Sequence, residues 1–307
     1  MMVTETVRRK SASQFAVALR RFRKSKAGLV GLGMLVFMCV LAAIGPRIAP
    51  YNVNSNNLLL QGDTDIPPTW LKPPLFHDWV FPFGTTVGGL DVFSGVLVSL
   101  HVDIIIGVGA ALFAMALAIL VGLVSGFYGR VVDTVLMRVT ELFIVFPALL
   151  FLLLLSRLLA GRLSGVETLL FYIIIIGVFS WATNARLIRG EVLRVKSLEF
   201  IESEKALGAS TTRIVFRHIL PNVLAQVVVL TSFTVATSIL TEVALFFLGF
   251  GSGNILSLGE IMYLNFPYMD VEWWAELFPG LSVVILVLAF NLLGDGLSDA
   301  LNPKLRE

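Results

Sequence analysis

The amino-acid sequence predicts an all-α integral membrane protein with six transmembrane helices. Three observations lead to this fold class: 57% of the 307 residues are hydrophobic, only 14% are charged, and the mean hydropathy is +0.88. Soluble globular domains carry about 25% charged residues, so the composition excludes that class. A helix crosses the hydrocarbon core with about 20 apolar residues, and the chain contains six segments that reach or approach this length.

The six predicted spans are Ala27 to Gly45, Ile104 to Gly129, Leu142 to Ser156, Thr168 to Ala185, Ile219 to Thr241 with a continuation to Phe250, and Leu277 to Gly294. The third span is short, but apolar residues on both sides extend it. It also contains Pro147, which is expected to kink the helix and which lipid-embedded helices tolerate. The single cysteine, Cys39, excludes an internal disulfide.

The basic residues predict the orientation of the spans. Four segments lie on one side of the membrane: the N-terminus, the C-terminus, the loop between spans two and three, and the loop between spans four and five. They hold all but four of the 23 Lys and Arg residues. The exceptions are Arg47, Lys72, Arg157 and Arg162. Because basic residues concentrate in cytoplasmic loops, both termini are expected in the cytoplasm. The expected segments are a basic amphipathic N-terminal segment (1–26), a first transmembrane helix (27–49), an extracytoplasmic loop (50–101), a five-helix core (102–303) and a short cytoplasmic tail (304–307).

The N-terminal segment places Phe15, Leu19 and Phe22 on one helical face, with basic residues on the others. Two interpretations stay open. The segment forms an interfacial helix on anionic membrane lipid, or it is a basic flank that only fixes the topology of the first span. A cleaved signal peptide is not expected, because the apolar core is too long and no clear cleavage site follows it.

The two predicted extracytoplasmic loops differ in composition. Residues 50–101 are rich in proline and contain Trp70 and Trp79, which favours ordered coil or short elements over a separate large domain. The loop 251–276 has no basic residue, but Trp273 and Trp274 stand directly before the sixth span. We interpret this pair as part of the aromatic belt at the membrane interface, with a ligand-binding role as the alternative.

The cytoplasmic loop 186–222 carries an unusual polar pattern between two apolar spans. Ser197 is expected to cap a helix that runs to Leu207 and stops at Gly208, the residue best suited to a left-handed terminus. Ser210 or Thr211 is expected to cap a second helix, which leads to Pro221. Two such short helices are marginal alone, so the unit is expected to pack against something. The alternative is a topology-fixing loop on lipid headgroups.

At this loop the sequence resembles the membrane subunit of binding-protein-dependent ABC importers, within the dipeptide/oligopeptide/nickel group. The family signature is Glu-Ala-Ala, three residues, Gly and a later Leu-Pro. Here Glu202-Ser203-Glu204 stands at the triplet, with serine and glutamate in place of the alanines, followed by Gly208 and Leu220-Pro221. "FGTTVGGLDVFSGVL" is similar to another family segment, with departures at Thr86 and Leu90 and with Asp91 kept. "LFPGLSVVILVLAFNLLGDGLSDALNPKLR" is similar too, and the resemblance spans nearly the whole chain.

The resemblance implies a type I importer permease fold, in which the loop is a coupling helix that docks in a cleft of an ATPase subunit. It assigns the docking contact to the following residues: Glu202, Ser203, Glu204, Ala206, Leu207, Gly208, Ala209, Ser210, Leu220 and Pro221. The implied partners are a second homologous permease, two ATP-binding subunits and an extracytoplasmic solute-binding protein, in a prokaryotic plasma (inner) membrane. The chain has no GxxxxGK[ST] phosphate loop, so it is expected to be non-catalytic, with ATP and Mg bound by the partner ATPases.

Four carboxylates are candidates for a structural or gating role: Asp91, Glu141, Glu242 and Asp295. For those in or near the spans, solvation at a helix end or interhelical bonding is the favoured interpretation. Glu242 is the strongest candidate for a structural or gating role, because apolar residues continue after it. The three histidines lack metal-ligand spacing, so no metal site is expected. Nothing in the pattern suggests nucleic-acid binding.

Two other function classes fit the composition less well. An ion-coupled secondary transporter usually shows internal repeats and mid-membrane carboxylates or broken helices, and no repeat is visible. A membrane-embedded enzyme needs a convergent cluster of catalytic groups, and none is visible. The resemblance implies that the chain is the membrane subunit of an ATP-driven importer, and the ion-coupled secondary transporter is the alternative from a different class. In the family the solute receptor selects the cargo; short peptides are expected, and oligosaccharides or nickel are the alternatives.

Overall fold

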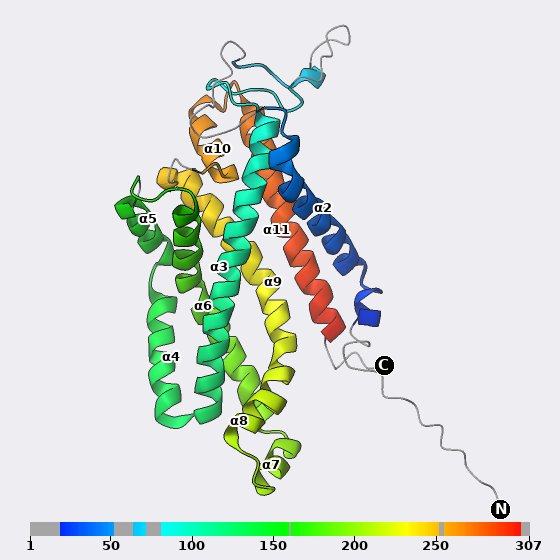
Figure 1. Ribbon diagram of the computed structural model, residues 1–307, viewed down its shortest axis with the longest axis vertical. Coiled ribbons are helices and arrows are strands. Elements are labelled where there is room, and N and C mark those ends of the chain that lie inside the picture. The colour runs from blue at the N-terminus through cyan, green and yellow to red at the C-terminus, as the bar shows by residue number, and fades with distance from the viewer. Residues whose placement is uncertain (1–18, 52–63, 72–80, 160, 252–254, 302–307) are drawn as a thin grey trace, which may run out of the picture.

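A computed structural model describes residues 19–51, 64–71, 81–159, 161–251 and 255–301 of the chain. It is an elongated bundle of long helices with short helices at both ends (Figure 1). Five described helices are long and apolar enough to cross a membrane, and the bent pair α4 and α5 makes a sixth if it counts as one span. This confirms the predicted all-α fold with six spans. The predicted tail 304–307 lies outside the described residues.

One side of the bundle consists of α2 (Lys26–Ile48), α3 (Val92–Tyr128) and α11 (Trp273–Leu301). The Ser25 hydroxyl caps α2 by accepting from the amide of Gly28. Asp91 caps α3, so that helix begins well before the predicted span at Ile104. The N-terminal face that was predicted from Phe15, Leu19 and Phe22 is described only in part: Leu19 is exposed, while Phe22 is buried against the crossing of α2 and α11.

The third span is broken rather than kinked. α4 (Arg130–Val145) ends at Phe146, α5 (Ala148–Leu159) begins after Pro147, and the two axes differ by 76°. Proline lacks the amide hydrogen that would continue the ladder, and it disfavours helical backbone at the residue before it. Phe146 accordingly has extended backbone, with φ −70° and ψ 132°.

The fourth and fifth spans are longer than predicted and meet at the end of the bundle that carries α7 and α8. α6 (Val166–Lys196) extends beyond the predicted end at Ala185. The fifth span runs through α8 (Thr211–Ile214), the π-helical turn η3 (Val215–Ile219), α9 (Leu220–Leu245) and η4 (Phe246–Phe250), where Gly249 leaves helical geometry with φ +80° and ψ 20°. The wide turn η3 ends two residues before Pro221, which cannot donate a backbone hydrogen bond.

The opposite end of the bundle carries α10 (Leu258–Asn265) and the described residues 64–71 and 81–91 that precede α3 (Figure 1). Here Trp274 is 5% exposed, and its indole N–H donates to the carbonyl of Thr85 at 3.0 Å. The interpretation of Trp274 as part of an interfacial belt is therefore wrong: the ring ties the loop to the start of α11. Its neighbour Trp273 is 39% exposed.

The helices approach closely at small residues, as membrane helices do. A β-carbon added to Gly31 of α2 would lie 2.6 Å from the backbone nitrogen of Leu293 in α11. One turn earlier, Gly28 and Gly296 face each other at the same crossing. The bundle core around α2, α3, α9 and α11 is aliphatic, with Leu286 and Ile239 fully buried.

Candidate functional site

The loop that resembles the coupling helix folds as a short helix, a tight turn and the start of the fifth span. α7 (Glu199–Ala206) ends at Leu207, and Gly208 takes φ +81°, in the left-handed region. The amide of Ala209 then donates to the carbonyl of Glu204 at 3.0 Å, and the amide of Gly208 donates to that of Lys205. These bonds satisfy carbonyls at the helix end, so the predicted stop at Gly208 is confirmed.

The start of the second helix also follows the prediction. The Ser210 hydroxyl accepts from the amide of Arg213, so Ser210, and not Thr211, is the cap. Ser197 was predicted to cap α7, and this is wrong. It follows the last residue of α6, and its hydroxyl donates to the carbonyl of Arg194. α6 continues past the end of its apolar pattern to Lys196, so Ser197 lies directly after α6. The residue before α7 is Leu198, whose side chain cannot cap a helix.

The segment 199–219, which we call the α7–α8 segment, is anchored by a few apolar side chains. Ile201, Ile214 and Ile219 are buried in one cluster with Val192 and Val195 of α6. Ala209 packs against the same cluster, so this residue is partly used within the chain. The segment is therefore held on the ends of α6 and α9, and only its outer face is free to meet another molecule.

That outer face carries exposed apolar and charged side chains together. Leu207 is 84% exposed and Phe216 is 64% exposed. Glu202, Ser203 and Ala206 are exposed on α7, and Pro221 is exposed just beyond the segment. Glu204 is half-buried, 3.6 Å from the imidazole of His218, and Leu220 is also half-buried. The predicted docking residues thus divide into an exposed set and a set that holds the turn.

The other candidate carboxylates lie apart from this segment. Asp91 is buried; it accepts hydrogen bonds from the amide and hydroxyl of Ser94, and burial raises the pKa of its carboxyl. Glu141 is partly exposed on α4 and pairs with Arg138 at 2.7 Å and with Arg186 at 3.9 Å. Asp295 is exposed on α11. These positions indicate helix capping for Asp91 and surface pairing for Glu141.

Glu242 is fully buried in α9 at the α10 end of the bundle. Neither of its carboxyl oxygens has a hydrogen-bond partner by distance and angle among the described residues. Asp103 of α3 is fully buried nearby and accepts from the amide of Leu258 at the start of α10, at 3.3 Å. Glu260 of α10 also faces this cluster, and burial raises the pKa of its carboxyl to about 7.

Sequence reasoning missed Asp103, because the predicted span began at the next residue. The signal was present: α3 continues in helical spacing through Asp103 from the aspartate cap at Asp91. Within the described ranges, no group of three or more His, Cys, Asp or Glu side chains has the arrangement to hold a metal ion.

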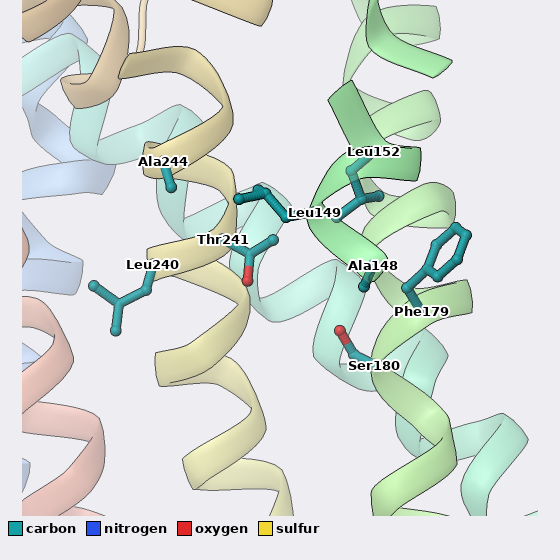
Figure 2. Close-up of a pocket in the computed structure, with 8 residues that line it drawn as sticks. All are labelled: Ala148, Leu149, Leu152, Phe179, Ser180, Leu240, Thr241 and Ala244. Atoms are coloured by element: carbon teal, nitrogen blue, oxygen red, sulfur yellow. The ribbon is translucent and has the colours of Figure 1, made fainter. Parts of the chain in front are cut away.

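A hollow of about 350 Å³ opens on the face of the bundle between α5, α6 and α9. Figure 2 shows Leu149 of α5 and Thr241 of α9 pointing toward one another across it. Its lining is aliphatic and aromatic, with hydroxyls from Ser180 and Thr241 and no charged side chain. The hollow can take an uncharged, mainly apolar group.

Two family models match the chain. Residues 118–307 match the binding-protein-dependent transport system inner membrane component, and residues 13–74 match the N-terminal TM domain of oligopeptide transport permease C. These matches cover the α7–α8 segment and the first span, respectively.

Similar curated proteins match over nearly the full length. The oligopeptide transport system permease protein OppC of Bacillus subtilis (strain 168) is 34% identical over 304 residues, which is 99% of this chain and 94% of that protein. The dipeptide transport system permease protein DppC of the same organism is also 34% identical, over 98% of this chain and 89% of that protein. The OppC protein of Mycobacterium tuberculosis (strain ATCC 25618 / H37Rv) is 30% identical, over 96% of each chain.

Proposed function

Because the chain belongs to the family of binding-protein-dependent transport system inner membrane components, we propose that it is the membrane subunit of an ATP-driven peptide importer. The observation that carries the proposal is the exposed apolar tip of the α7–α8 segment. The Leu207 side chain is 84% exposed. Binding in a protein cleft would remove this apolar surface from water, which lowers the free energy.

The proposed topology places the α7–α8 segment and both termini in the cytoplasm. The support is the excess of basic residues on that side of the spans, including Arg186, Arg189, Arg194 and Lys196 at the end of α6. The opposite end, with α10 and the loop before α3, then faces outward, where a solute-binding protein would dock.

The proposed partners are a second homologous permease, two ATP-binding subunits and a solute-binding protein. ATP binding and hydrolysis, with Mg, belong to the ATP-binding subunits, since this sequence has no phosphate-binding loop. The chain itself would be non-catalytic. It converts movement of the α7–α8 segment into movement of the spans.

The cargo is proposed to be short peptides. The relatives at 34% identity are named as oligopeptide and dipeptide permeases. The uncharged hollow beside α5 and α9 is compatible with a passing peptide whose side chains vary, because it offers hydroxyls and apolar surface and no fixed charge. Oligosaccharides and nickel remain the alternative cargoes; the absence of charged lining residues disfavours free nickel ions.

The test is purification followed by transport. A C-terminally tagged chain is extracted in mild detergent with its co-expressed neighbours, reconstituted into vesicles with a solute-binding protein, and supplied with ATP and a labelled tripeptide. We expect co-purified phosphate-loop ATPases and tripeptide accumulation that stops without ATP. Accumulation driven by an ion gradient alone, from a chain that purifies by itself, would contradict the importer and support a secondary transporter.

A further inference from the structure

Helix α4 has little apolar attachment to the bundle. Among its described residues only Thr140 is buried, while Val131, Val135 and Val145 are 75%, 56% and 84% exposed. The described apolar contacts of α4 include Phe143, whose ring packs against Trp181 of α6 with 5.4 Å between the ring centroids, near the end of α4 that leads to the break. Nearer its start, α4 is joined to α3 and α6 by polar contacts.

One polar cluster connects α4 to both neighbouring helices. Arg189 of α6 donates through Nε to one carboxylate oxygen of Asp133 in α4, and through a terminal nitrogen to the other, each at 2.5 Å. The hydroxyl of Ser125 in α3 donates to the same carboxylate at 2.6 Å. Only 19% of the Asp133 side chain and 29% of that of Arg189 are exposed, so water screens this pair less than an exposed surface pair.

The geometry of the pair suits transmission of movement. A bidentate guanidinium–carboxylate contact fixes the relative orientation of the two side chains as well as the distance between them, which a single hydrogen bond does not. We call the side chains of Ser125, Asp133 and Arg189 the α4 clamp. A second pair, Glu141 with Arg186, also joins α4 to α6, but at 3.9 Å and with both side chains over 40% exposed. The α4 clamp is thus the shorter and less exposed of these two ion pairs between α4 and α6.

Arg189 stands about two turns before the end of α6, which leads directly into the α7–α8 segment. The same part of α6 is fixed to α3 by Lys196, whose ammonium donates to the carbonyl of Phe127 at 2.5 Å. At its far end α4 passes through the break at Pro147 into α5, which lines the hollow with Leu149 and Leu152. The clamp therefore lies between the docking segment and the hollow.

We propose that Asp133 and Arg189 are positioning residues that transmit movement of the α7–α8 segment to the broken α4–α5 span, and so couple ATP hydrolysis to passage of the cargo. The inference rests on the proposed function. It predicts that the clamp affects how much peptide moves for each ATP hydrolysed. A purely structural role would change the amount of folded complex and leave that ratio unchanged.

The experiment measures tripeptide uptake and ATP hydrolysis in the same vesicles for the full complex. In Asp133→Asn and Arg189→Gln we expect ATP hydrolysis to continue and the uptake-to-hydrolysis ratio to fall about tenfold. The exchange variant, with Asp133→Arg and Arg189→Asp together, should recover much of the ratio, because the contact is restored in reverse. The matched control is Glu191→Gln, which breaks the pair of Glu191 with Arg194 within α6 and should leave the ratio unchanged.

A ratio that stays at the wild-type value in both single variants would overturn the proposal. If the single variants do not assemble, Ser125→Ala is measured instead, since it removes one donor to Asp133 and keeps the ion pair. We then expect the ratio to fall about twofold to threefold, and an unchanged ratio would overturn the proposal as well. If the wild-type complex shows no ATP-dependent uptake, the proposed function itself is rejected. This result differs from an unchanged ratio in the variants, which rejects only the role of the α4 clamp.

Discussion

Gly208→Val is expected to abolish most ATP-driven uptake while leaving the spans folded. Gly208 holds φ +81° at the turn between α7 and α8, and a β-branched residue is strongly disfavoured there. The strain is about 1–2 kcal/mol, which corresponds to roughly a fivefold to thirtyfold loss of the turn population. No atom of the described residues lies within 4 Å of the added β-carbon, so the expected effect comes from the backbone conformation and not from a clash with them. The exposed Leu207 would then be displaced from the surface of the ATP-binding subunit in which we propose that it docks.

The matched control is Gly208→Asn, because asparagine tolerates left-handed backbone far better than valine does. We expect Asn to keep most of the uptake and Val to lose about nine-tenths of it, at equal amounts of protein in the membrane. Uptake, membrane abundance and bound ATP-binding subunits are measured together. Equal uptake by both variants would show that the backbone conformation at residue 208 does not matter for coupling.

Gly31→Leu is expected to detach α2 from α11 and to destabilise the protein. The added β-carbon would lie 2.6 Å from the backbone nitrogen of Leu293 and 2.7 Å from Cβ of Leu292, and backbone cannot yield without moving the helix. Overpacking of this kind costs about 1–3 kcal/mol, and more where helices must separate. The measurement is the temperature at which half of the detergent-extracted protein aggregates, and we expect it to fall.

The control comes from the same helix. Gly33 is exposed, and a β-carbon there would meet no atom within 4 Å in the part of the chain that the structure describes. Gly33→Leu adds the same side chain to α2 and should leave the aggregation temperature unchanged or slightly higher, because leucine favours helix more than glycine does. A similar loss of stability in both variants would mean that the close crossing of α2 and α11 is not what Gly31 provides.

Much of the fold follows from the sequence, because the bilayer imposes simple length and polarity limits on each span. All six apolar segments correspond to helices, the third to the bent pair α4 and α5, and the turn at Gly208 follows from backbone preferences. The sequence predicted a cap at Ser210 or Thr211, and the structure places it at Ser210. The break at Phe146 and Pro147 was predicted as a kink. Its 76° angle depends on tertiary packing, which local preference does not encode.

The parts that sequence did not predict depend on contacts between distant segments. Trp274 looked like an interfacial residue until its hydrogen bond to Thr85 placed it inside the fold. Asp103 lay one residue outside an apolar run, so no pattern joined it to Glu242 or to α10. The α4 clamp likewise combines residues 56 positions apart, and periodicity within one helix carries no information about such a pair.

We propose that the α7–α8 segment docks in an ATP-binding subunit, and cross-linking at Leu207 can detect this contact in cells. A photoreactive amino acid replaces Leu207 in cells that express the whole transport system, and the adducts are identified by mass spectrometry. The control replaces Leu120 of α3, which is 62% exposed along a span. We expect a phosphate-loop ATPase to be cross-linked at position 207 and none at position 120. Adducts at position 207 with lipid alone, in cells that still import peptide, would contradict it.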